Sequence, residues 1–351
     1  MRKAIYILLI LSSLIARGQD PHFSQFYANP LYLSPSLAGA TDGGRLIVNY
    51  RNQWPEVSKA FSTYAISFDN FFASFNSGIG FSLMQDRAGS AGLTTTQAAF
   101  QYSYNLMITD YWQLVPAIQF AYGNKKVDFS KAIFPDQPPS TGGSSGAYNR
   151  LSNEQVHYID LASSVFLYSP KYWVGLTVDH LAKPNYTFLN EESKAELKFT
   201  LFGGMNIWRE RSRHKSNRAF SASFRYQKQA EFDQLDLGVY WHNAPLEIGM
   251  WYRGLPLINK VEGSKAANQD AIIALLAYDL GPLRVGYSYD IAIGSLGWST
   301  GGAHELSLIF EFNQRSRLRS GGRRPAVPCS ESANPLNSIG GKYTRKKRRL
   351  Y

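Results

Sequence analysis

The feature that most constrains this chain is a strict alternation of apolar and polar residues in two runs near its end. In the run 283–291 the apolar residues are Leu283, Val285, Tyr287, Tyr289 and Ile291, and the residues between them are Arg284, Gly286, Ser288 and Asp290. The run 303–312 repeats the pattern, with Leu306, Leu308, Phe310 and Phe312 on one face. A period of two is typical of a β-strand. Both a soluble sandwich and a membrane barrel contain such strands.

Similar runs recur along the chain. They are predicted at 44–54, 61–72, 78–87, 93–106, 111–122, 156–168, 171–180, 196–207, 218–228, 232–241, 244–253, 270–279, 283–292 and 303–312. Many have about the 9–11 residues that a tilted strand needs to cross a bilayer. Tryptophans near the ends of runs, as in an interfacial aromatic belt, are Trp54, Trp112, Trp208, Trp241 and Trp251. After the first residues, no run reaches the ~18 apolar residues of a membrane helix.

The lengths of the connections favour a membrane barrel over a sandwich. The longest connections, at 123–155, 181–195, 254–269 and 294–302, all follow odd-numbered runs. The tightest, at 109–110, 169–170, 242–243 and 281–282, all follow even-numbered runs. Outer-membrane barrels sort their loops in this way, with short turns on the periplasmic side. We therefore predict an all-β fold, a transmembrane antiparallel barrel of about fourteen strands over 44–312, with both termini in the periplasm of a Gram-negative bacterium.

The two ends of the chain are predicted to lie outside the barrel. Residues 1–18 have the basic, apolar and small-residue regions of a signal peptide. The region 313–351 contains eleven Lys or Arg against one Glu, whereas residues 19–312 carry a net charge of −2. This composition predicts a basic, disordered periplasmic tail, whose residues Arg345, Lys346, Lys347, Arg348 and Arg349 are candidates for docking to a partner. A solvated end without a partner fits the tail equally well. Cys329 has no second cysteine with which to pair.

The segment 19–43 is predicted to be ordered and to pack inside or under the barrel. Its three prolines exclude a regular central strand or a long helix, and its apolar content is high for a free linker. The residues predicted to form this plug are His22, Phe23, Phe26, Tyr27, Asn29 and Pro30.

The sequence contains no recognisable catalytic, cofactor or metal motif. The six histidines lack an HExxH spacing, and the pair His304 and Glu305 is interpreted as structural. Gly78-Ile79-Gly80 lacks the third glycine of a dinucleotide fingerprint and is interpreted as a strand with small inward positions. Inward charges are expected at Asp179, Arg225, Asp236, Glu247, Arg253, Arg284 and Asp290. They could line a channel, but pairing within a filled lumen is favoured because unpaired buried charges are costly.

Several ordered segments resemble one family of outer-membrane proteins. They include Asp20-Pro21-His22-Phe23-Ser24-Gln25-Phe26, the run 29–39, Asn49-Tyr50-Arg51-Asn52-Gln53-Trp54-Pro55, Asp86-Arg87-Ala88-Gly89, Gly286-Tyr287-Ser288-Tyr289-Asp290 and 302–308. Together these segments resemble the PorP/SprF family across residues 19–312. The resemblance implies a barrel associated with the type IX secretion system and, in many members, with gliding motility. It also implies a role in exporting surface adhesins or holding them at the cell surface.

On this basis we expect a non-enzymatic protein without cofactors, whose partners are a secreted adhesin or its C-terminal domain, other secretion components and outer-membrane lipid. Nucleic acid is not expected, because a secreted barrel does not meet any. Residues expected to bind partners are Phe134, Pro135, Tyr148, Tyr186 and Phe188 in the outer loops, and Arg209, Arg211, Arg213 and Lys215 in a basic turn on the tail side. Two alternatives stay open: a channel for a small solute and an outer-membrane hydrolase.

Overall fold

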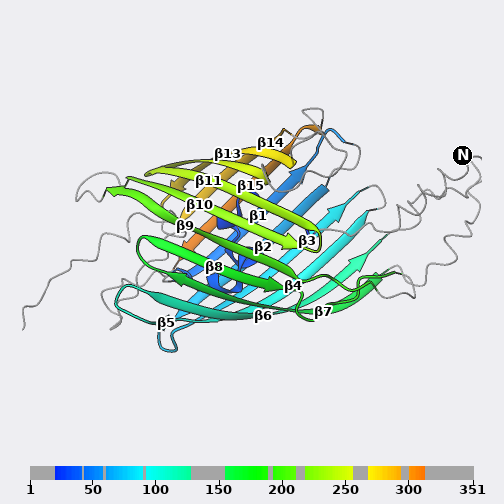
Figure 1. The fold of residues 1–351 in the computed structure, drawn as a ribbon, viewed down its shortest axis with the longest axis horizontal. Coiled ribbons are helices and arrows are strands. Elements are labelled where there is room, and N and C mark those ends of the chain that lie inside the picture. The colour runs from blue at the N-terminus through cyan, green and yellow to red at the C-terminus, as the bar shows by residue number, and fades with distance from the viewer. Residues whose placement is uncertain are drawn as a thin grey trace, which may run out of the picture.

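The computed structural model describes residues 20–41, 43–57, 61–89, 92–127, 155–188, 193–210, 218–255, 268–293 and 300–312. Fourteen long strands form one closed antiparallel barrel (Figure 1). They are β1 (Gly44–Gln53), β2 (Phe61–Phe72), β3 (Ser77–Ala88), β4 (Leu93–Tyr104), β6 (Gln113–Lys126), β7 (Gln155–Tyr168), β8 (Tyr172–Asp179), β9 (Lys198–Glu210), β10 (Arg218–Gln229), β11 (Phe232–Asn243), β12 (Leu246–Leu255), β13 (Asn268–Leu280), β14 (Leu283–Ala292) and β15 (Ala303–Phe312). The two-residue β5 (Leu106–Met107) pairs with β6 just after β4. The barrel closes where β1 pairs with β15.

Each of the fourteen predicted runs coincides with one long strand, so the predicted all-β barrel is confirmed. The predicted and observed strands differ mainly in the residues at which they begin and end. The turn predicted at 242–243 lies at Ala244 and Pro245, because Pro245 has no amide hydrogen for the ladder while the two residues before the turn continue β11. The connection predicted to begin at 123 begins at 127, since Lys126 still pairs with Gln155. In the described part of the chain, no helix has the length and apolar character needed to cross a bilayer.

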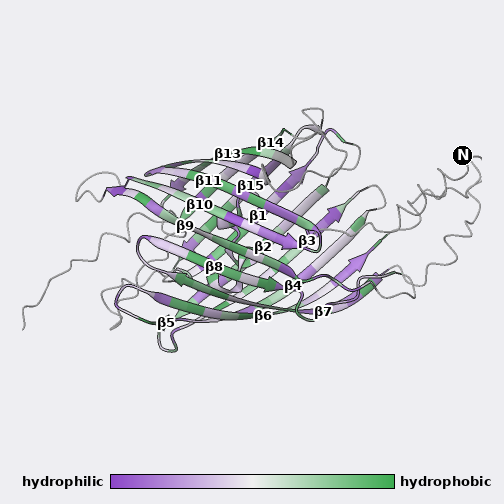
Figure 2. Cartoon of the chain, viewed as in Figure 1, coloured by the Kyte–Doolittle hydropathy of each residue, from purple (hydrophilic) through white to green (hydrophobic). Residues whose placement is uncertain are grey.

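The faces of the strands are inverted relative to a soluble protein. In β15, Leu306 and Leu308 are 41% and 37% exposed, whereas Glu305 and Ser307 are 1% and 2% exposed. The same alternation of hydrophobic and hydrophilic residues is visible along many strands (Figure 2). Apolar side chains on the outside and polar ones within are what a lipid-embedded barrel requires. One predicted belt residue is wrong: Trp251 is 1% exposed and points inward, because its neighbour Met250 in β12 faces outward and consecutive side chains of a strand alternate.

Connections at the two ends of the barrel differ in length. One end carries the connections 54–60, 89–92, 127–154, 180–197, 230–231, 256–267 and 293–302, and is called the long-loop end. The other carries 73–76, 108–112, 169–171, 211–217, 244–245 and 281–282, and is called the short-turn end. Both β1 and β15 have their outer termini, Gly44 and Phe312, at the short-turn end, where they pair with each other.

Residues 20–41, here called the lumen segment, run through the barrel from the long-loop end to the short-turn end. The segment contains three short helical turns, η2 (Phe26–Ala28), α2 (Pro30–Leu33) and η3 (Pro35–Leu37), drawn in dark blue within the barrel in Figure 1. A Cβ added at Gly78 would lie 2.1 Å from the Ala38 carbonyl oxygen. Glycine at position 78 lets the β3 backbone approach the lumen segment closely. This agrees with the interpretation of Gly78-Ile79-Gly80 as a strand with small inward positions.

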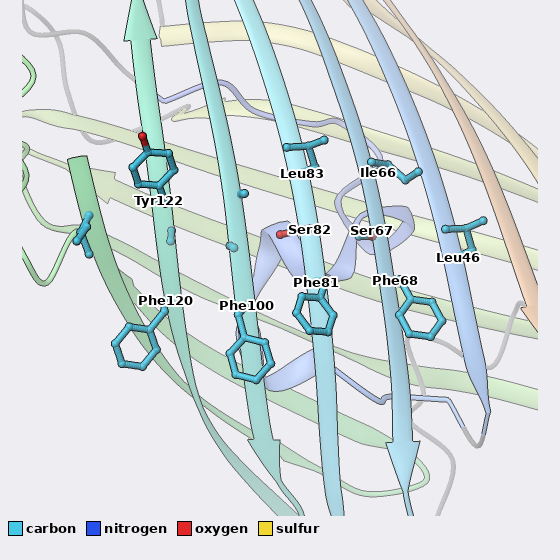
Figure 3. A pocket seen from close by; sticks show the side chains of 14 residues that line it. Leu46, Ile66, Ser67, Phe68, Phe81, Ser82, Leu83, Phe100, Phe120 and Tyr122 are labelled. Atoms are coloured by element: carbon cyan, nitrogen blue, oxygen red, sulfur yellow. The ribbon is translucent and has the colours of Figure 1, made fainter. Parts of the chain in front are cut away.

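The outer surface carries an apolar hollow of about 640 Å³ over β1–β4, β6 and β7. Phe68, Phe81, Phe100 and Phe120 follow one another across neighbouring strands, and Leu83 and Tyr122 flank the smaller Ala98 in the next row (Figure 3). The apolar side chains of the hollow belong to the lipid-facing surface of the barrel. It is therefore not a site for a soluble ligand.

Candidate functional site

The lumen segment is held near the long-loop end by charged side chains of the barrel wall. The Ser24 amide donates a hydrogen bond to Glu305 Oε2 (2.7 Å), and the Gln25 amide donates to Glu305 Oε1 (3.0 Å). The Ser24 hydroxyl donates to Asp290 Oδ2 (2.6 Å) and accepts from Arg51 Nη1 (2.7 Å). Because Arg51 also pairs with both carboxylates, at 2.9 and 3.2 Å, one serine joins β1, β14 and β15.

A second group of ion pairs continues this network around the wall. Arg253 Nε lies 3.1 Å from Asp236 Oδ1, and Arg253 Nη1 lies 3.1 Å from Asp290 Oδ2. Arg225 pairs with Asp236 and donates to the Phe23 carbonyl (3.2 Å). The lumen charge cluster therefore consists of Arg51, Arg225, Arg253, Asp236, Asp290 and Glu305, each at most 4% exposed. Its three positive and three negative charges balance, and paired burial avoids the large cost of an isolated buried charge.

Aromatic packing fills the middle of the lumen. The Phe26 and Trp251 rings meet edge to face with centroids 4.7 Å apart, and Trp173 donates from Nε1 to the Tyr27 hydroxyl (3.0 Å). Arg225 lies over the Phe26 ring, 4.4 Å from its centroid. Such contacts add to the apolar burial of these rings. Segment and wall therefore pack as one core.

The segment is also fixed at the short-turn end. The Gly39 amide donates to Asp69 Oδ2 (2.7 Å), and Arg45 pairs with the same carboxylate through Nε (2.9 Å). The Ser103 hydroxyl donates to the Ala38 carbonyl (2.8 Å). Gly39 has a φ of +66°, which suits glycine at this turn into β1.

A second charged group, here called the rim cluster, surrounds the start of the segment at the long-loop end. It consists of Asp20, Asp160, Asp179, His180 and Lys198. His180 lies 2.7 Å from Asp160 Oδ2 through Nδ1 and 2.8 Å from Asp20 Oδ2 through Nε2. Lys198 Nζ lies 3.0 Å from Asp20 and 3.3 Å from Asp179. Burial lowers the pKa of His180, but the two carboxylates outweigh it and raise the pKa from 6.5 to about 9.

All six residues predicted for the plug lie in the lumen segment. Phe23, Phe26, Asn29 and Pro30 are buried, and His22 and Tyr27 are half-buried. His22 Nε2 lies 3.1 Å from Arg253 Nη1. The seven inward charges predicted from the sequence all take part in ion pairs, including Arg284 with Glu247 and Asp179 with Lys198. Their predicted pairing is confirmed.

The structure describes three of the predicted partner-binding residues, and they lie at the two ends of the barrel. Tyr186 is half-buried at the long-loop end, packed on Tyr158 with centroids 4.8 Å apart and under Lys125 Nζ at 3.6 Å. Phe188 follows it in the same connection, and Arg209 lies near the short-turn end of β9. The remaining predicted residues lie outside the described ranges: Phe134, Pro135, Tyr148, Arg211, Arg213, Lys215, Arg345, Lys346, Lys347, Arg348 and Arg349.

The expectation of two periplasmic termini concerns residues outside the described ranges, as does the predicted signal peptide. The first and last described residues, Asp20 and Phe312, lie at opposite ends of the barrel. The orientation of the N-terminus therefore stays a prediction.

Sequence reasoning missed the residues that receive the segment. Arg51 and Glu305 were not singled out as inward charges, although each lies on the polar face of an alternating run. Apart from Asp179, the rim cluster was missed because its members come from four separate parts of the chain. His304 and Glu305, considered as a catalytic pair, point to opposite faces: His304 bonds to the outward Tyr287 hydroxyl (2.7 Å), whereas Glu305 faces the lumen. They cannot act on one substrate together.

Within the described ranges, no three His, Cys, Asp or Glu residues are grouped to hold a metal.

Replacing Arg253 with alanine should destabilise the barrel by about 3 kcal/mol, because Asp236 and Asp290 each lose a buried partner. Urea unfolding in lipid vesicles measures the change. The matched control is Met250→Ala on the same strand, whose side chain is 60% exposed on the outer face. Equal losses in the two variants would contradict a stabilising role for the cluster.

The rim cluster should make stability depend on pH. Because folding raises the pKa of His180 from 6.5 to about 9, its contribution is fully present below pH 6.5 and is lost as pH rises through about 9. The free energy of unfolding should therefore differ most between the parent and His180→Asn near about pH 6, by at most about 3 kcal/mol, and least near about pH 10. A difference that does not change with pH would contradict the charge pairing.

Comparison with known proteins places this chain in a family. The sequence profile described as type IX secretion system membrane protein PorP/SprF matches residues 15–310. A search of curated proteins found no match. Among solved structures, the P. putida toluene transporter TodX is similar with 9% identity, 80% of this chain and 93% of that chain covered, and a TM-score of 0.46. A double mutant of the Rh. blastica porin is similar with 8% identity, 77% of this chain and 98% of that chain covered, and a TM-score of 0.34. The profile covers most of the chain, which therefore belongs to the PorP/SprF family of type IX secretion system membrane proteins.

Proposed function

We propose that this protein is a non-enzymatic outer-membrane component of the type IX secretion and gliding machinery, and that it helps to export a secreted surface adhesin or anchors it at the cell surface. The observation that carries the proposal is the packed lumen. Because the lumen segment is bonded to the wall from Asp20 to Gly39, the barrel interior is occupied by its own chain. Contacts with other proteins then fall to the two rims.

The long-loop end is the proposed extracellular face. It carries the connections 127–154, 180–197 and 256–267, which offer more surface than the turns at the opposite end. Loops on a rigid scaffold are the usual place for recognition. We propose that the adhesin, through its C-terminal domain, binds here, while outer-membrane lipid covers the apolar outer face of the strands.

The short-turn end is the proposed periplasmic face. β15 ends there at Phe312, where the basic region 313–351 begins, and the basic turn 211–217 connects β9 to β10 at the same end. Both segments are rich in Lys and Arg. We propose that they dock to acidic surfaces of periplasmic secretion components.

A crosslinked pull-down from intact cells tests this two-sided arrangement. The full chain should recover both an exported surface protein and periplasmic components. A chain ending at Asn313 should recover only the surface protein, because it lacks the basic tail. A chain shortened within 128–154 should lose the surface protein and keep the periplasmic components.

Heat-dependent migration on gels checks that each variant still forms a barrel. Recovery of the same proteins with all three chains would overturn the assignment of the two ends. Recovery of no exported protein with the full chain would overturn the proposed function itself.

The alternative, a channel for a small solute, predicts a different electrical behaviour. A lumen filled by residues 20–41 should conduct no measurable current in planar bilayers. Arg51→Ala combined with Arg253→Ala removes two guanidinium groups that hold Ser24, so this double variant should show intermittent openings. Steady conductance from the parent protein would favour the channel.

A further inference from the structure

The apolar hollow on the outer surface is bordered by polar side chains toward the long-loop end. Ala98 of β4 lines the hollow, and the next outward residues of that strand are Thr96 and Thr94, about 7 Å and about 13 Å away. Residues in register with these two threonines on the neighbouring strands are also polar. The two rows, here called the polar ledge, consist of Gln85, Thr96, Asn124 and His157, and of Arg87, Thr94, Lys126 and Gln155.

The polar ledge is continuous with the hollow. Tyr122 lines the hollow with its ring (Figure 3), and its hydroxyl lies 2.6 Å from His157 Nδ1 in the ledge. Gln85 Nε2 donates to the Thr96 hydroxyl (3.3 Å), and Asn124 Nδ2 lies 3.1 Å from His157 Nδ1. A tyrosine with its ring in an apolar surface and its hydroxyl among polar groups is typical of the level where hydrocarbon meets headgroups. The ledge therefore lies at the headgroup level of the membrane.

The polar ledge contains two cations. Arg87 and Lys126 are exposed on the two sides of Thr94, with their backbones about 10 Å apart. A Cβ added at Gly92 would lie 3.8 Å from Arg87 Nη2, so the guanidinium reaches the start of β4. Within the described ranges, neither cation has an ion-pair partner, and no outward-facing residue of β1–β4, β6 or β7 is acidic. The ledge therefore carries positive charge without a counter-charge among the described residues.

Another outward lysine at the long-loop end has a counter-charge. Lys228 of β10 lies directly opposite Asp233 of β11. Opposite charges in such cross-strand positions attract each other. Arg87 and Lys126 instead lie on either side of Thr94, which carries no charge to neutralise them. Positive charge above an apolar membrane surface attracts an anion that has an apolar part.

We propose that the hollow and the polar ledge together bind one anionic lipid of the leaflet at the long-loop end. Its acyl chain lies in the hollow over Ala98, and a phosphate of its headgroup lies between Arg87 and Lys126. A lipid is the occupant because irregular polypeptide does not occur against hydrocarbon, which leaves an acyl chain to fill the hollow. The Arg87 guanidinium can bind two phosphate oxygens at once, whereas the Lys126 ammonium acts as a point charge. This site needs no partner protein and does not rest on the proposed function.

Native mass spectrometry of the full chain, released from nanodiscs, tests the chemistry of the lipid. The nanodiscs contain equal amounts of phosphatidylglycerol and phosphatidylcholine, which both carry a phosphate, but only phosphatidylglycerol is anionic. The parent should retain phosphatidylglycerol preferentially. Arg87→Gln combined with Lys126→Gln should lower this preference about thirtyfold, because each basic side chain near a membrane surface contributes about a fivefold preference. The control Lys228→Gln should keep the preference of the parent.

Three results of this experiment would overturn the proposal. They are equal retention of the two lipids by the parent, parent-like retention by the double variant, and an equal loss in the control. Inorganic phosphate should not displace the lipid, because it has no acyl chain to replace the one in the hollow. Release of the lipid by inorganic phosphate alone would therefore also overturn the proposal.

A second pair of variants tests the hollow separately. Ala98→Phe fills the hollow and keeps both cations, so it should lower the retention of phosphatidylglycerol severalfold. Ala274→Phe places the same side chain at an outward alanine of β13 and should leave retention unchanged. Heat-dependent migration on gels checks that all variants form barrels. Equal retention by the two variants would overturn binding in the hollow.

Photo-crosslinking in intact cells distinguishes a lipid from polypeptide at the ledge. A benzophenone amino acid at position 85 of the full chain should give a product whose added mass is that of a phosphate-containing lipid. Crosslinks to residues 128–154 of the same chain or to another protein would overturn the proposal. Mass spectrometry of the other variants decides the matter if this variant does not assemble.

Discussion

Balanced ion pairing inside a closed barrel is the interaction on which the rest of this structure depends. Arg51, Arg253 and Arg225 would each be costly to bury alone, and so would the three carboxylates that face them. Together they pair with one another, and they also bond to the Ser24 hydroxyl, the Ser24 and Gln25 amides and the Phe23 carbonyl. The lumen segment is therefore part of the hydrogen-bonding network of the charged wall residues. Removing it would leave buried donors and acceptors without partners.

The alternation that specified the strands is local, and this is why it could be recognised in the sequence. Leu306 faces lipid and Glu305 faces the lumen simply because consecutive side chains of a strand point to opposite sides. The same rule made the inward charges recognisable, and the cost of burying an unpaired charge favoured pairing. What the pattern could not supply was the partner of each charge. Ser24 and Glu305 are 281 residues apart, and no local period joins them. Trp251 was assigned to the interfacial belt because the predicted run ended at 253, but its position in β12 turns it onto Phe26.

The two ends of the barrel differ in the length of their connections and in their charge. At the short-turn end, tight turns such as Ala244-Pro245 join neighbouring strands directly. The basic region of the sequence begins after Phe312. At the long-loop end the strands end at different heights, and the inward turn of His180 separates β8 from β7. The rim cluster thus both fixes the start of the lumen segment and shapes the neighbouring surface.

The path of residues 20–41 has a consequence for how the protein is made. The segment precedes β1 in the chain, yet its contacts reach β14 and β15 as well as β2, β7 and β10. Contacts so distant in sequence close late, because the entropy of a long loop must be overcome first. The segment that is synthesised first can therefore complete its native contacts only after β14 and β15, the last strands of the chain, have joined the barrel.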